Sequence, residues 1–137
     1  MIAINTVFLM FFIIIIIETI IYSKTTKKPA FLGLSFSLTY LLNVIIGGII
    51  IYRYILQDGE SVLLWLLYIQ YTVPISLAYI FYDNVLMSII QYDYMIVNYV
   101  MPFIFMGIFG SIQYYLIGFI IGKIIKKKRV GASLHKI

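Results

Sequence analysis

An unbroken apolar run opens the chain at residues 2–22 and includes five consecutive isoleucines at positions 13–17. Polar and apolar residues do not alternate in it, as they do in the strands of an outer-membrane barrel. At a rise of about 1.5 Å per residue, a helix over this run has roughly the length of the bilayer hydrocarbon. Such a helix satisfies its own backbone hydrogen bonds, which lipid cannot do. We therefore predict a first transmembrane helix over residues 2–22.

The whole chain is poor in polar residues: 64% of its 137 residues are hydrophobic, 11% are charged, and the mean hydropathy is +1.07. A soluble domain of this length would expose more apolar surface than it could bury, so we predict an all-α integral membrane protein with one domain. The first run has no basic start and no small-residue cleavage site, so a removable signal peptide is not expected. The absence of cysteine excludes disulfides and thiolate metal sites.

Three further apolar segments and a basic tail follow the first run. The segments are residues 31–55, 61–82 and 103–125, and the basic tail is residues 126–137, in which Gly131, Ala132 and Ser133 predict a short loose terminus. Pro29 and Pro102 stand where a helix can start, and Ser61 can cap the helix that follows it. Pro74 lies in the middle of its segment and predicts a kink, because it removes one backbone donor.

The stretch between the last two segments is only half apolar. On a helix over residues 84–98, four polar side chains lie close to one face: Asn84, Ser88, Gln91 and Asn98. Asp93 falls on nearly the opposite side. As an interfacial or re-entrant amphipathic helix this stretch leaves four spans. As a short fifth span it needs Asp93 and the polar face to meet protein or water.

The distribution of basic residues bears on this choice. Six of the ten lie at the C-terminal end, and Lys24, Lys27 and Lys28 lie in the first linker. Four spans place linker and tail on opposite sides, whereas five place both inside and only Arg53 outside, which the positive-inside rule favours. An acid such as Asp93 near the bilayer centre costs about 2.5–3.5 kcal/mol on insertion scales. We predict four spans plus the amphipathic helix, with five spans as the alternative, a cytoplasmic C-terminus and residence in the plasma (inner) membrane.

Two segments carry stripes of small or polar residues. Ser35, Thr39, Asn43 and Gly47 recur at intervals of four in the second segment, and indicate a packing face or a pore lining. Gly107, Ser111, Gly118 and Gly122 share one face of the last segment, and positions 118–122 form a GxxxG. Missing side chains let another backbone approach closely. We predict that this second stripe is a helix-packing interface, with another protomer or a partner protein.

Glu18 is the acid of the first segment, about one turn before the first linker. An intramembrane acid is a candidate functional residue, together with Asp93 if its stretch spans. Glu18 is also close enough to a helix end to reach the interface or to pair with Lys24. Both interpretations of Glu18 stay open.

Catalysis has little support, because His135 is the single histidine and the chain has neither a metal-ligand cluster nor a phosphate-binding loop. We expect no enzyme, no cofactor and no metal. The basic tail is first an orientation signal and second a contact for anionic lipid headgroups, and no nucleic acid is expected.

Three functions fit this description. The first is a pore or channel formed by several copies of the chain, lined by Asn84, Ser88, Gln91 and Asn98 or by Ser35, Thr39 and Asn43. In its short, very apolar format with a basic C-terminus, the chain is similar to phage holins and membrane-permeabilising effectors. The second is an accessory or scaffolding subunit of a larger membrane complex. The third is a miniature transporter, because small multidrug transporters also have a glutamate in the first of four helices, to which Glu18 is the possible counterpart.

Overall fold

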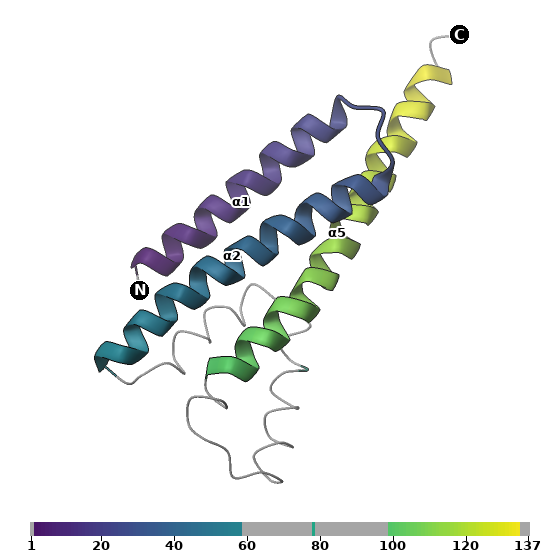
Figure 1. Ribbon diagram of the computed structural model, residues 1–137. Coiled ribbons are helices and arrows are strands. Elements are labelled where there is room, and N and C mark those ends of the chain that lie inside the picture. Colours follow the sequence, from purple (N-terminus) through teal and green to yellow (C-terminus); the bar gives the residue numbers. More distant parts are fainter. Residues whose placement is uncertain (1, 59–77, 79–98, 135–137) are drawn as a thin grey trace.

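The computed structural model describes residues 2–58, 78 and 99–134 (Figure 1). It contains three long helices: α1 (Ile2–Ser23), α2 (Pro29–Asp58) and α5 (Met101–Leu134). No strand occurs in the described ranges. These helices include the predicted spans 2–22, 31–55 and 103–125. The predicted span 61–82, apart from Ala78, and the predicted amphipathic helix 84–98 lie outside the described residues.

All three helices are long and apolar enough to cross a membrane, over Asn5–Ser23, Pro29–Arg53 and Met101–Ser133. The prediction of a helical membrane protein is confirmed at this level. Helix α5 has 34 residues, which corresponds to about 51 Å and exceeds the hydrocarbon thickness. Most of the basic tail therefore continues the helix instead of forming a loose terminus. Lysine and arginine favour helix, and cations stabilise a helix C-terminus.

A short polar loop reverses the chain between α1 and α2. The end of α1 is closed by Ser23 Oγ, which donates to the Ile20 carbonyl (2.6 Å), and by Thr25 Oγ1, which donates to the Tyr22 carbonyl (2.9 Å). Tyr22 Oη donates in turn to the Lys27 carbonyl at 3.0 Å. These bonds satisfy groups that a helix end leaves without intrahelical partners. The reversal makes α1 and α2 antiparallel neighbours.

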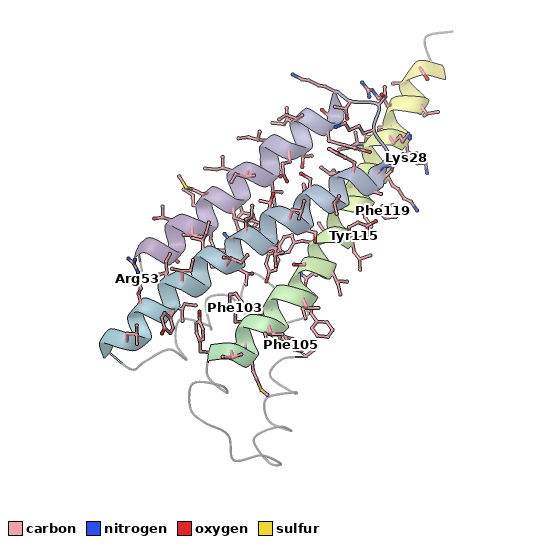
Figure 2. All side chains as sticks on the ribbon, in the orientation of Figure 1. Lys28, Arg53, Phe103, Phe105, Tyr115 and Phe119 are labelled. Atoms are coloured by element: carbon pink, nitrogen blue, oxygen red, sulfur yellow. The ribbon has the colours of Figure 1, made fainter. Side chains whose placement is uncertain are left out.

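Helices α2 and α5 are also antiparallel. Gly122, late in α5, faces Pro29 at the start of α2, and Phe103, early in α5, faces Gly48 late in α2. Lys28 and Phe119 thus lie towards one end of the pair, and Arg53 and Phe103 towards the other (Figure 2).

The first linker and the basic end of α5 consequently lie together. Arg129 Nη1 donates to the Thr25 carbonyl at 2.6 Å, which joins residues 104 positions apart. This arrangement does not fit the predicted four-span topology, in which α2 and the last span run parallel and the linker and tail lie on opposite sides.

Glycines bring the α2 and α5 backbones into close approach. A Cβ on Gly118 would lie 2.8 Å from the Leu32 carbonyl oxygen and 2.9 Å from the Gly33 Cα. A Cβ on Gly33 would lie 2.7 Å from the Tyr115 carbonyl oxygen. Real Cβ atoms do not come this close to a backbone, so only glycine fits at both positions without a shift of the helices.

An aromatic core joins all three helices. The ring of Tyr40 (α2) stacks on that of Tyr114 (α5) at 4.7 Å between centroids, and Phe11 (α1) meets Tyr114 edge-on at 5.1 Å. Tyr40 is fully buried, and its Oη donates to the Met106 carbonyl at 3.2 Å. Its ring lies against Gly110, where a larger residue would collide with it. The described helices therefore meet in a packed centre.

Candidate functional site

The α1–α2 contact contains the intramembrane acid. Thr39 Oγ1 on α2 donates to Glu18 Oε1 on α1 at 2.6 Å. The second oxygen, Oε2, is buried and has no hydrogen-bond partner in the described part of the chain. Glu18 forms no ion pair there either, so the alternative in which it pairs with Lys24 is not what the structure shows. The carboxyl group points between two helices and leaves one acceptor unused.

Asn43 lies one helical turn further along the same face of α2. Its Nδ2 donates to the Val7 carbonyl of α1 at 3.2 Å, and the residue is 5% exposed. Thr39 and Asn43, two members of the predicted polar stripe, therefore face α1 directly. Ser35 is half-buried and Gly47 is buried. This side of α2 thus uses its polar groups to hold α1.

A groove runs along this polar contact. Its volume is about 350 Å³, at the lower end of the range of about 300–1,000 Å³ that small-molecule clefts have. It is lined by Val7, Met10, Phe11 and Ile14 of α1 and by Thr39, Leu42, Asn43 and Ile46 of α2. The lining is apolar except for the threonine and the asparagine.

The outer face of α1 is a continuous apolar surface, with Leu9 64% exposed and Ile21 58% exposed. Only one side of α1 is therefore held by the rest of the described protein.

The predicted glycine stripe of α5 divides between two environments. Gly118 and Gly122 pack against α2 of the same chain. In the described part of the chain, the atom nearest to a Cβ on Gly107 is Leu41 Cδ1 at 4.0 Å, and Ser111 Oγ donates to the Gly107 carbonyl at 2.5 Å. The open half borders a groove of about 550 Å³, lined by Leu41, Val44, Ile45, Phe103, Ile104, Gly107, Ile108 and Ser111. Among the described residues, the part of this stripe around Gly107 is the one that no other helix covers.

The sequence did not predict a pocket at the basic end of the molecule, where the first linker meets the last turns of α5. A pocket of about 300 Å³ lies between the first linker and the last turns of α5, and it is lined by Tyr22, Thr25, Thr26, Lys27, Ile125, Lys126, Arg129, Val130 and Ser133. The ammonium of Lys27 lies 3.8 Å from the centre of the Phe31 ring. The sequence signal that could have indicated this pocket was the charge count, which favoured linker and tail on one side of the membrane.

Several predicted site residues lie outside the described residues: Pro74, Asn84, Ser88, Gln91, Asp93 and Asn98. Within the described ranges, no group of three or more histidine, cysteine, aspartate or glutamate side chains could hold a metal ion.

No protein-family model, curated protein or solved structure matches the chain. The described helices define it as a polytopic helical membrane protein. Its function is therefore inferred from their geometry and from the residues they carry.

Proposed function

We propose that the protein crosses the membrane five times and that several copies assemble into an ion-conducting pore. The observation that carries this proposal is the antiparallel packing of α2 and α5. If both helices span, the chain between Asp58 and Met101 must cross an even number of times. The apolar segment 61–82 is long enough for one crossing, so it needs a companion, and residues 84–98 are the candidate.

A crossing at 84–98 would bring polar groups into the membrane. Asn84, Ser88, Gln91 and Asn98 share one face of that helix, and such groups are stable at membrane depth only against protein or water. A polar face of this kind lines a water-filled path in channels. The described helices cannot supply that path, because Phe11, Tyr40 and Tyr114 fill the space where they meet. Several copies around a common axis would enclose it.

Glu18 supports a conducting function independently. Its position between two helices, with Oε2 lacking a donor in the described residues, is costly for an ionised carboxylate. Acids within membranes face a partner, a cavity or an ion path. In the assembled pore, water or a cation beside Glu18 would satisfy this oxygen.

The topology can be tested with single cysteines, because the chain has none of its own. Lys27→Cys, Arg53→Cys and Ser133→Cys are labelled with a membrane-impermeant thiol reagent in intact and in opened cells. We expect Lys27→Cys and Ser133→Cys to react from the cytoplasmic side and Arg53→Cys from the outside. Labelling of the first two from opposite sides would overturn the five-span proposal.

The activity can be tested with purified protein in liposomes. We expect the protein to release a K⁺ gradient by itself, and Gln91→Leu to reduce that flux because it removes a polar group from the proposed lining. Ile21→Leu, on the lipid-facing side of α1, is the matched control and should conduct normally. A wild-type protein that assembles but does not conduct would instead favour an accessory subunit.

The Glu18–Thr39 pair favours a miniature transporter as a second candidate. Thr39 lines a groove, and the Glu18 carboxyl group that it binds has one oxygen without a partner in the described part of the chain; this group could exchange a proton for a cationic substrate. Glu18→Gln keeps the shape and removes the charge. Abolished proton-coupled uptake in this variant would support transport, whereas flux that follows the ion gradient without a proton gradient would support the pore.

A further inference from the structure

The pocket at the basic end combines charge and apolar surface. Lys27 comes from the first linker, and Lys126 and Arg129 come from α5. Tyr22, Ile125 and Val130 form the apolar part of the wall. No acidic residue is among its described lining residues. The pocket therefore suits a ligand with an anionic group next to a hydrocarbon portion.

One of its cations is held in place. Arg129 Nη1 donates to the Thr25 carbonyl at 2.6 Å, which fixes the guanidinium between linker and helix. A guanidinium has five N–H donors, so this bond leaves others for a ligand, and their planar arrangement matches two oxygens of a phosphate. The bond is also possible only because α1, α2 and α5 bring residues 25 and 129 together.

If α1 and α5 span the membrane, the pocket lies at the depth of the lipid headgroups. Helix α1 ends at Ser23, and the strongly apolar part of α5 ends at Ile125. Arg129 is about 6 Å further along the helix axis, within the interfacial region that flanks the hydrocarbon. A lipid at this point would present its phosphate to the cations and its glycerol and acyl chains to the apolar wall.

We infer that this pocket binds the phosphate of an anionic phospholipid. The inference needs only that α1, α2 and α5 span the membrane, and it is independent of pore activity. It differs from general attraction of a basic tail to a negative surface, because it assigns binding to particular cations. Lys127 and Lys128 belong to the same tail and are exposed, yet they do not line the pocket.

The test compares two pairs of substitutions that remove equal charge from the full chain. Lys126→Gln with Arg129→Gln changes the pocket, and Lys127→Gln with Lys128→Gln changes the tail outside it. Binding of phosphatidylglycerol and of phosphatidylcholine to detergent-purified protein is measured by mass spectrometry of the intact complex. We expect the pocket pair to weaken phosphatidylglycerol binding about twenty-five-fold, from about a fivefold loss for each of the two charges, and the tail pair to leave it near the wild-type value.

Three results would overturn the inference. Equal losses in both pairs would mean surface attraction only. Equal binding of phosphatidylcholine would mean that the lipid's net charge is not recognised. Competition by millimolar inorganic phosphate as effective as that by phosphatidylglycerol would mean a site for a free anion. Arg129 also holds the linker through its bond to the Thr25 carbonyl, so the single variant Lys126→Gln is measured as well. Lys126 lines the pocket, and no bond from it to the linker is seen among the described residues. Lys126→Gln should therefore weaken binding about fivefold without loosening the linker.

Discussion

Helix α2 packs against its two neighbours in different ways. Towards α5 it presents Gly33, where a methyl group would collide with the Tyr115 carbonyl oxygen, and Gly48, where it would collide with the Phe103 ring. Towards α1 it presents Thr39 and Asn43, which hydrogen-bond to a carboxylate and to a backbone carbonyl. Lipid is as apolar as the helices, so association in a membrane depends on close packing or on polar contacts. Helix α2 uses close packing towards α5 and polar contacts towards α1.

The two contacts differ in how easily they can change. Close backbone packing cannot accommodate a shift without collision, whereas side-chain hydrogen bonds can be exchanged for bonds to water. The α2–α5 pair is therefore the rigid part of the described protein. The α1–α2 contact is the part suited to opening, because it contains the groove and a Glu18 oxygen that has no hydrogen-bond partner among the described residues.

The largest expected effect is that of Gly118→Ala. Its Cβ would lie 2.8 Å from the Leu32 carbonyl oxygen, and backbone must move because no flexible side-chain end can yield there. Overpacking of this kind costs about 1–3 kcal/mol. We expect such a loss in the free energy of unfolding, measured by SDS titration in mixed micelles. Gly131→Ala has no atom within 4 Å of the new methyl group and is the matched control. Equal stability of the two variants would contradict the close packing.

A smaller loss is expected from Thr39→Val. Valine keeps the shape but removes the hydroxyl group that donates to Glu18 Oε1 at 2.6 Å. Interhelical hydrogen bonds in membranes contribute about 0.6 kcal/mol on average and up to about 1.7 kcal/mol, so we expect a loss of about 1 kcal/mol in the same titration. Thr39→Ser keeps the donor and should recover most of the stability. A Thr39→Ser variant less stable than Thr39→Val would show that packing by the methyl group, and not the bond, holds α1.

The sequence alone predicted that the chain forms helices apolar enough to cross a membrane. It did not predict which helix packs against which helix face. Apolar length and composition determine that α1, α2 and α5 suit a bilayer. A stripe such as Gly118 and Gly122 indicates how closely a helix can approach, but not which helix does so. The contact of Glu18 with Thr39 depends on the register of two helices, which no local pattern specifies. The four-span prediction gave more weight to the cost of burying Asp93 than to the lysines shared by the first linker and the tail. The antiparallel directions of α2 and α5 agree with the distribution of these lysines.

The smallest effect on stability is expected at Gly107. Among the described residues, the atom nearest to its Cβ position is Leu41 Cδ1 at 4.0 Å, so alanine fits without a shift. Alanine also loses less backbone entropy than glycine in a helix. We expect Gly107→Ala to change the free energy of unfolding of the monomer by less than about 0.5 kcal/mol. If copies associate through the groove around Gly107, the methyl group would instead reduce the oligomer mass measured by light scattering in detergent. A decrease in the free energy of unfolding as large as that of Gly118→Ala would show that this part of α5 is packed as closely as the rest. The groove around Gly107 would then have no room for a second copy.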